Sequence, residues 1–327
     1  AWGVVLGSMG HLLIQMPGLV RYHMRYTLSL GLRTAGVHEV GRLMLPRVVG
    51  LAAVQINFLV NTILASGLTA GSLSALSFAW LLMLLPQGVF AQAVATAAFP
   101  TFSEQAAKEL RVEMRSTLGA TLRAVLYLSI PAAVGLVILR TPLVQLLFER
   151  GAFGQTSTQM VAWALGLYTL GLPAHSVVEI VVRAFYALHD TKTPVGVGIA
   201  TMVLNVVLSL AFIAAFDSWG WMPLGGLALS NTLATTVEAI VLLVLIRPRL
   251  GGLEGRQLAI LLVRTGLAAA LMAAALGALV WFLKDYSARL VGALGIAVGL
   301  AIYGAATVLL GAPEPRMVWR LVVGRRR

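Results

Sequence analysis

Residues 184–216 read AFYALHDTKTPVGVGIATMVLNVVLSLAFIAAF, and this stretch decides the fold class. Its polar knot, HDTKTP at 189–194, separates an apolar run over 157–188 from another over 195–216. A helix rises about 1.5 Å per residue, so about 20 apolar residues cross a hydrocarbon layer of about 30 Å. The stretch therefore predicts two membrane-spanning helices joined by a short polar turn.

The remainder of the chain repeats this alternation of long apolar runs and short polar turns. Hydrophobic residues make up 59% of the 327 residues and charged residues only 11%, whereas about 25% of the residues of a soluble domain are charged. Within a bilayer only helices and closed barrels satisfy every backbone hydrogen bond, and the alternation typical of barrel strands is absent from the sequence. We predict an all-α polytopic membrane protein with about nine transmembrane helices, at 2–20, 43–65, 72–100, 118–139, 157–188, 195–216, 223–246, 258–283 and 289–311.

The basic residues are distributed unevenly between the two sides of the membrane. If the segment after the first helix is cytoplasmic and the helices alternate, the 24 lysines and arginines all fall on the cytoplasmic side except Arg140, Arg150, Lys284 and Arg289. Cytoplasmic loops are enriched in Lys and Arg, so we predict this orientation, with a cytoplasmic C-terminus. The net charge of +12 is then a topology signal and a contact for membrane lipids, and nucleic acid is not expected as a partner.

Three local breaks interrupt the regular pattern. Pro86 is expected to kink the helix that begins near residue 72. The segment TPLVQLLFERGAFG at 141–154 is apolar but short, which fits an interfacial or re-entrant piece. The linker RPRLGGLEGRQ at 247–257 separates a six-helix block from a final helix pair.

Several polar residues fall inside predicted spans, where polar groups are costly. They are Asn57 and Asn61 in the second span, Asn205 and Ser209 in the sixth, and Thr232, Thr236 and Glu238 in the seventh. One interpretation is that they hydrogen-bond between helices and stabilise packing. The other is an oxygen-rich site for a hard cation. The spacing does not decide between the two.

His175, Glu179 and Arg183 form one stripe along the fifth predicted span, at i, i+4 and i+8. Glu179 and Arg183 stand in the order that favours an ion pair on a helix. The pair either neutralises two buried charges or forms the charged wall of a water-filled substrate path. Arg47 and Arg123 lie within about two turns of the cytoplasmic face, so each either extends to that interface or joins the same path.

The polar knot also has a local explanation. Asp190 or a neighbouring Thr is expected to cap the next helix, with Pro194 in its first turn. Lys192 adds to the cytoplasmic charge. An enzyme is not expected, because Glu179 and Glu238 are the only acids within predicted spans and lie on different helices. The chain has no cysteine, which excludes disulfides and thiolate metal sites.

Three blocks of the sequence resemble one transporter family. RAFYALHDTKTPV at 183–195, the long block LPRVVGLAAVQINFLVNTILASGLTAGSLSALSFAWLLMLLPQGVFAQAVATAAFPTFS at 45–103, and NVVLSLAF followed by PLGGLALSNTLAT at 205–235 carry the resemblance. They are similar to the MurJ/MviN family, the lipid II flippases of peptidoglycan synthesis, within the multidrug/oligosaccharidyl-lipid/polysaccharide exporter superfamily. By this resemblance the nine helices correspond to the family's helices six to fourteen.

The resemblance implies a domain plan and a function. Residues 1–20 would be the last helix of a missing N-terminal lobe, 21–42 a cytoplasmic linker, 43–247 a six-helix lobe, and 248–327 two extra helices with a basic tail. Alternating access in the bacterial cytoplasmic membrane would flip an undecaprenyl-pyrophosphate-linked glycan, lipid II, through a cavity between two lobes. Arg47, Arg123, His175, Glu179 and Arg183 would line the substrate path, and Asp190, Lys192 and Pro194 would belong to a gate loop.

The sequence departs from the family pattern at two places. Leu81 stands where the family has a cavity-facing arginine. At the positions of the sodium site known in some members, Asn61, Asn205, Ser209 and Thr232 include no carboxylate, so a monovalent cation is expected to bind only weakly and no other cofactor is expected. The alternatives are an exporter of another polyprenyl-linked glycan and a non-transporting scaffold of the cell-wall machinery.

Overall fold

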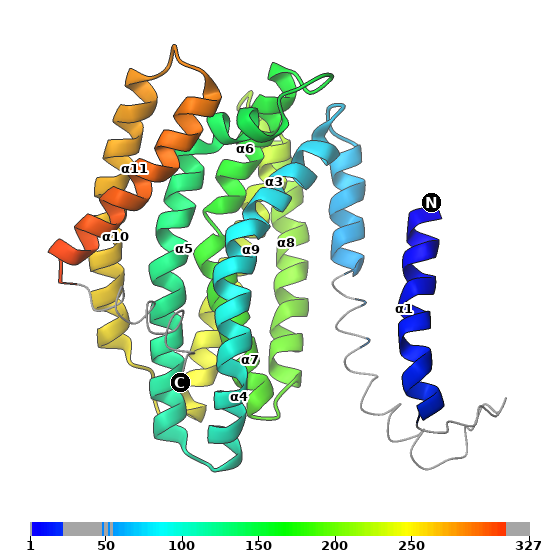
Figure 1. The fold of residues 1–327 in the computed structure, drawn as a ribbon, viewed down its shortest axis with the longest axis vertical. Coiled ribbons are helices and arrows are strands. Elements are labelled where there is room, and N and C mark those ends of the chain that lie inside the picture. The colour runs from blue at the N-terminus through cyan, green and yellow to red at the C-terminus, as the bar shows by residue number, and fades with distance from the viewer. Residues whose placement is uncertain (1, 22–47, 49–51, 53–54, 312–327) are drawn as a thin grey trace. The chain divides into compact units, whose positions relative to one another are not determined.

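The computed structural model describes residues 2–21, 48, 52 and 55–311. The chain falls into two compact units, Ala1–Val48 and Val49–Arg327. In the first unit the described element is α1 (Trp2–Arg21), a helix of 20 residues. The second unit contains the other helices that the structure describes (Figure 1).

Every regular element of the second unit is helical within the described residues. Residues 55–66 are helical, and then come α3 (Ser72–Pro86), the π-helix η1 (Gln87–Gln92), α4 (Ala93–Ala107), α5 (Arg111–Phe148), α6 (Gln155–Thr169), α7 (Leu172–Ala187), α8 (Lys192–Ser218), α9 (Leu224–Arg249), α10 (Gly255–Phe282) and α11 (Ala288–Leu309).

Six of the described helices are long and apolar enough to cross a membrane, or seven if α6 and α7 form one bent span. This confirms the prediction of an all-α polytopic membrane protein and six of its predicted spans, with the run at 157–188 as a seventh if the bent pair is one span. The predicted span at 2–20 is helical as α1, but it is not among those six. The predicted span at 43–65 lies partly outside the described residues.

The breaks in the helices differ in part from prediction. Pro86 ends α3 and is followed directly by η1, so the expected irregularity is present there. The run at 157–188 is bent by 48° between α6 and α7. The interfacial piece expected at 141–154 is wrong up to Phe148, because α5 continues to that residue through Pro131 and Pro142. This segment packs on α11, where a Cβ on Gly292 would lie 3.4 Å from Leu146 Cδ2.

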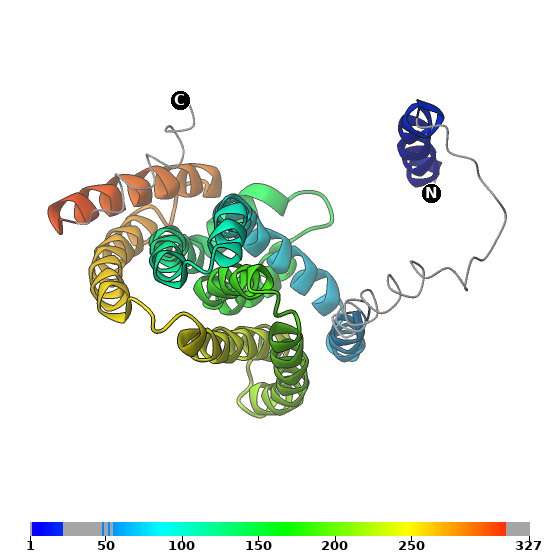
Figure 2. The same ribbon diagram turned by 90° about the horizontal axis from the view of Figure 1, so that it is seen from below.

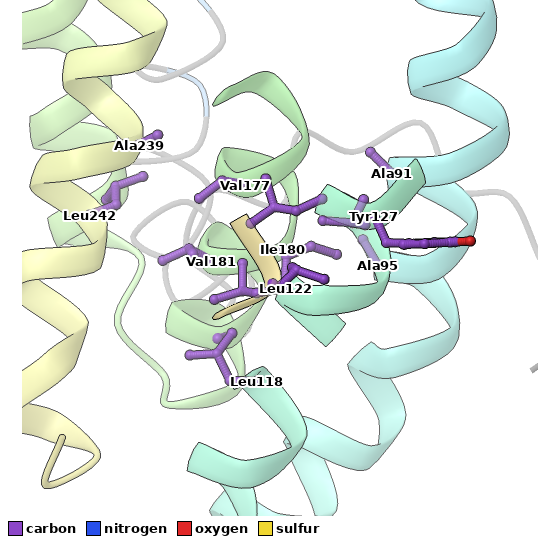
Figure 3. Packing of buried hydrophobic residues seen from close by; sticks show 14 of the residues in the cluster. Ala91, Ala95, Leu118, Leu122, Tyr127, Val177, Ile180, Val181, Ala239 and Leu242 are labelled. Atoms are coloured by element: carbon purple, nitrogen blue, oxygen red, sulfur yellow. The ribbon is translucent and has the colours of Figure 1, made fainter. Parts of the chain in front are cut away.

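The core is built around α7. Seen from the end of the bundle, α7 lies between α5 and α9, and α10 and α11 lie beside α5 (Figure 2). Leu122 of α5, Ile180 of α7 and Leu242 of α9 belong to one cluster of fully buried apolar side chains (Figure 3). The polar residues of α7 are therefore held on a rigid, centrally packed helix.

Candidate functional site

A cavity of about 360 Å³ opens beside the C-terminal half of α7. It is lined by Phe99 of α4 and by Glu179, Val182, Arg183 and Tyr186 of α7. Arg183 Nη1 lies 2.6 Å from Glu179 Oε1, and each side chain is 25% exposed. The predicted ion pair is present, and it forms part of a cavity wall.

Arg183 is fixed mainly by contacts within its own helix. Its Nη1 also donates to the backbone oxygen of Glu179 at 2.8 Å. A guanidinium carries five N–H donors in a planar fork, and both bonds recorded to Glu179 use a single nitrogen. The cavity thus combines a cation, an anion, a phenol and an aromatic ring, a mixture suited to a ligand that is both anionic and partly apolar.

His175, the third member of the predicted stripe, does not line this cavity. Its Nε2 lies 3.1 Å from Oδ1 of Asn231 on α9. Its ring meets that of Trp80 on α3 edge to face, with centroids 5.6 Å apart. The stripe is therefore divided: His175 connects α3, α7 and α9, and the other two residues form the cavity wall.

Arg123, another arginine of the predicted path, does not line this cavity. Arg123 Nη1 lies 2.5 Å from Oε2 of Glu254, the residue before α10. The Arg123 side chain is only 16% exposed and is paired with this linker residue, and its extension to the membrane interface stays a prediction. Arg47 lies outside the described residues.

The predicted gate loop is a tightly bonded turn between α7 and α8. Asp190 accepts hydrogen bonds from the Thr193 backbone N–H at 3.0 Å and from its hydroxyl at 2.6 Å, which confirms that Asp190 caps α8. The same carboxylate pairs with Arg249 at the end of α9, at 2.5 Å. Lys192 begins α8 and Pro194 lies in its first turn, as expected.

The charge state of Asp190 follows from these contacts. Burial raises the pKa of its carboxyl, but the hydrogen bonds from Thr193 and the charge of Arg249 outweigh burial and leave the pKa below its usual value. The turn is therefore held by an ionised carboxylate at neutral pH. Arg249 is further placed over the ring of Phe185, 5.4 Å from its centroid.

The four residues of the predicted cation site are divided between separate hydrogen-bonded groups. Asn61 Nδ2 donates to Asn205 Oδ1 at 3.1 Å. Ser209 Oγ lies 2.8 Å from Oγ of Ser230. Thr232 Oγ1 donates a hydrogen bond of 2.7 Å to the backbone oxygen of Leu167 on α6, which is 65 residues away in the sequence. Asn61 and Asn205 are therefore in contact with each other. The hydroxyls of Ser209 and Thr232 each contact a residue outside the predicted set.

Among the described residues, no group of three or more His, Cys, Asp or Glu side chains is placed to hold a metal ion. At the positions of the sodium site implied by the resemblance, the hydroxyls of Ser209 and Thr232 are bonded to Ser230 and to the Leu167 backbone oxygen. These contacts favour the interpretation that the polar residues join helices.

Sequence reasoning missed several residues of these arrangements. Phe99 lies in an apolar run with no distinguishing signal, and Tyr186 was visible only as part of the block RAFYALHDTKTPV at 183–195. Arg249 was counted solely as cytoplasmic charge, although the acid opposite it, Asp190, was identified. Leu81, which replaces the expected cavity arginine, is 52% exposed on α3.

Residues 1–295 match the family model described as lipid II flippase MurJ. The chain is 30% identical over 330 residues to the "Probable lipid II flippase MurJ" of Haemophilus influenzae, a match that covers 97% of this chain and 63% of that protein. It is 32% identical over 324 residues to the protein of the same description from Vibrio cholerae, covering 95% and 59%. The chain therefore spans about 60% of the length of these relatives.

A solved structure described as "Lipid II flippase MurJ, inward closed conformation" has the same fold. Its TM-score with this chain is 0.72 at 23% sequence identity, and the match covers 91% of this chain and 58% of that one. The similarity extends over nearly the whole of the present chain.

Proposed function

Because this chain belongs to the lipid II flippase MurJ family, we propose that it takes part in moving lipid II across the bacterial cytoplasmic membrane. The substrate is then a polyprenyl pyrophosphate that carries a glycan head group. Alternating access is the expected mechanism, since a charged head group crosses a bilayer only through a path that excludes the lipid tails.

The cavity beside Glu179 and Arg183 supports this proposal most directly, because it indicates which residues contact the substrate. Pyrophosphate oxygens are acceptors for a guanidinium fork, and such charge-assisted hydrogen bonds are about twice as strong as neutral ones. Without substrate, Arg183 donates a hydrogen bond to the Glu179 carboxylate. When a phosphate approaches, the Arg183 guanidinium turns some of its N–H groups to the phosphate oxygens. Phe99 and Tyr186 provide apolar and hydroxyl contacts for the remainder of the ligand.

The other residues have supporting roles in this scheme. Asp190 and Arg249 hold the cytoplasmic turn next to α7 closed, and Lys192 and Pro194 set the start of α8. His175 positions α7 against α3 and α9. Arg47 belongs to the proposed path by resemblance. Arg123 contributes indirectly, because its guanidinium is engaged by Glu254.

Transport also needs a second lobe in this proposal, because an alternating-access cavity forms between two lobes. We place the N-terminal lobe of the longer relatives in that role, with the C-terminus of this chain in the cytoplasm. The uneven distribution of lysines and arginines supports this orientation.

A second candidate function is supported by Leu81. Its half-exposed apolar side chain stands where the resemblance places an arginine that contacts pyrophosphate. An exporter of a different polyprenyl-linked glycan would tolerate this change if its head group were recognised elsewhere.

Expression of this chain together with the N-terminal lobe of a longer relative, in cells depleted of their own lipid II flippase, tests the proposal. We expect lipid II to become accessible on the outer face, and Arg183→Ala to reduce this accessibility while Arg111→Ala at the exposed start of α5 does not. Lipid II that stays inside, together with export of another polyprenyl-linked glycan, would favour the second candidate. A protein that exports neither would be a scaffold.

A further inference from the structure

Glu238 is a carboxyl group placed in the middle of a membrane-spanning helix. It belongs to α9, one of the helices long and apolar enough to cross a membrane. At 1.5 Å per residue, Glu238 lies about 21 Å from the beginning of α9 at Leu224 and about 16 Å from its end at Arg249. An ionisable group at this depth is costly unless it is paired or neutral.

The immediate surroundings of Glu238 come from α8. Its Oε2 lies 3.4 Å from Oγ1 of Thr201, which is longer than the usual distance between two hydrogen-bonded oxygens. Its Oε1 faces Gly198, where a Cβ would lie 3.7 Å away. Glu238 is in none of the ion pairs found among the described residues.

The charged and titratable groups on the helices packed against α9 contact other residues or lie near the helix ends, and Tyr186 of α7 lines the cavity beside Glu179. On α7, His175 contacts Asn231 and Glu179 pairs with Arg183. On α8 the charged residues, Lys192 and Asp217, lie in its first and last turns. Tyr168 is the titratable residue of α6 and packs on Trp80, and α3 has none. On α9 itself, Arg249 pairs with Asp190 and Arg247 lies in the last turn.

The hydrogen bonds of Thr201 indicate which form of Glu238 fits the site. Its hydroxyl oxygen lies 3.1 Å from both the Val197 and Gly198 backbone oxygens, and a hydroxyl has one proton to donate. These carbonyls are closer than the carboxyl, so an ionised Glu238 would compete for that proton and lose. A protonated Glu238 instead donates its own O–H to Thr201, and both hydroxyl protons then have an acceptor.

A seam of buried polar groups continues from Thr201 along α8. Asn205 and Ser209 follow at i+4 and i+8, and all three are buried against neighbouring helices. Asn205 is 2% exposed, and its Nδ2 has no hydrogen-bond partner. A buried, unpartnered donor is rare and often marks the position of an ordered water. Further along, Ser209 contacts Ser230 of α9.

We propose that Glu238 is a proton-binding site within the membrane, with Thr201 and the free amide of Asn205 as the first groups of its hydrogen-bonded path. The carboxylate takes up one proton from the side to which it is open and returns one proton to the other side, and no other bond is made or broken. A proton fits better than a metal ion, because hard divalent cations take six or more oxygen ligands. The contact from Asn61 uses Asn205 Oδ1 and leaves Asn205 Nδ2 for this path.

Infrared difference spectroscopy of the protein in lipid nanodiscs tests this site without any transport. At neutral pH we expect the carbonyl absorption of a protonated carboxyl, lost in Glu238→Gln and kept in Glu104→Gln, the matched change at an exposed glutamate. Thr201→Val should shift the frequency of this absorption, which keeps the test decisive if Glu238→Gln does not fold. An absorption that is absent from the wild type, or unchanged in both Glu238→Gln and Thr201→Val, would overturn the proposal.

The role of the proton in transport rests on the proposed function and has its own readout. The amide of glutamine can also donate a hydrogen bond to Thr201, so a purely structural Glu238 predicts the same pH profile of lipid II transport for Glu238→Gln as for the wild type. We expect a transport rate that varies with pH in the wild type and is flat in the variant. A retained absorption without transport would contradict the proposed function alone, whereas pH-dependent transport without the absorption would contradict the proton site alone.

Discussion

Arg123 of α5 forms an ion pair with Glu254, the residue immediately before α10, with 2.5 Å between Nη1 and Oε2. Gly119, one turn earlier on α5, permits this approach, because a Cβ there would lie 2.7 Å from the same Oε2. Arg115 donates to the Gly251 backbone oxygen in the same linker. The linker between α9 and α10 is therefore bonded to α5 along two turns.

The Arg123–Glu254 pair predicts a specific loss of stability. Both side chains are less than a fifth exposed, so Arg123→Ala leaves Glu254 poorly solvated and should lower the free energy of unfolding by about 3 kcal/mol. Arg123→Met with Glu254→Leu should cost less than the single change, since no charge is left unpaired. Unfolding in lipid nanodiscs measures both, with the exposed Lys108→Ala as control. If Arg123→Ala lowered the free energy of unfolding no more than Lys108→Ala, the ion pair would not be what holds the linker.

The Asp190–Arg249 pair predicts a dependence of stability on pH. Because the pKa of Asp190 is lowered in the folded protein, its contribution is present above the unfolded pKa and is lost as the pH falls through the folded pKa. Asp190→Asn should therefore cost about 1 kcal/mol at neutral pH, a small value because Arg249 is 42% exposed. The difference from the wild type should vanish in acid.

Thermal unfolding over a pH series checks this expectation. Asp217→Asn, an exposed change at the other end of α8, is the control and should match the wild type at neutral pH. A difference between wild type and Asp190→Asn that persists below the acid transition would mean that the charge of Asp190 is not what holds the turn.

The neutral hydrogen-bonded groups at the predicted cation site predict weak sodium binding. Asn61 and Ser209 contribute no charge, and Coulomb attraction to one carboxylate at short range is worth about 4 kcal/mol at intermediate dielectric. Replacing Na⁺ with K⁺ should leave the thermal stability of the wild type unchanged. Asn61→Asp with Ser209→Asp should introduce a stabilisation by sodium. Saturable, sodium-selective binding to the wild type, measured by calorimetry, would refute this expectation.

The orientation of the chain can be tested at the two ends of α8. Thr191 before its start and Ser218 at its end are both exposed, and the protein has no native cysteine. Thr191→Cys should be protected from an impermeant maleimide in intact cells and Ser218→Cys should be labelled, because cytoplasmic loops collect the basic residues. The reverse pattern would invert the topology and remove the basis for a cytoplasmic gate.

Local sequence patterns predicted the features that depend on neighbours along the chain. Apolar length located six spans, or seven if α6 and α7 form one bent span, and helical spacing identified the Glu179–Arg183 pair. Length alone did not distinguish an interfacial piece from the continuation of α5 over 141–148, because packing on Gly292 decides it. Gly171 and Pro173 indicate a break between α6 and α7. The break was not predicted because both residues lie inside one long apolar run.

Contacts between distant residues were not predictable in this way. Glu254 is 131 residues from Arg123, and no pattern in the sequence pairs them. The spacing of Asn205 and Ser209 placed both on one face, but their partners on other helices, Asn61 and Ser230, follow only from the packing of the bundle. The cavity at Phe99 likewise exists because α4 crosses α7 at that level.

Photo-crosslinking of lipid II in the cavity tests the central claim most directly. A photoreactive phenylalanine analogue in place of Phe99 should form an adduct with lipid II, and the same analogue in place of the exposed Trp281 at the end of α10 should not. The adduct should be lost in Arg183→Ala and kept in Arg111→Ala, because the guanidinium beside the cavity binds the pyrophosphate. An adduct at position 99 that is as strong in Arg183→Ala as in the wild type, or none at all, would contradict the assignment of this cavity to the lipid II path.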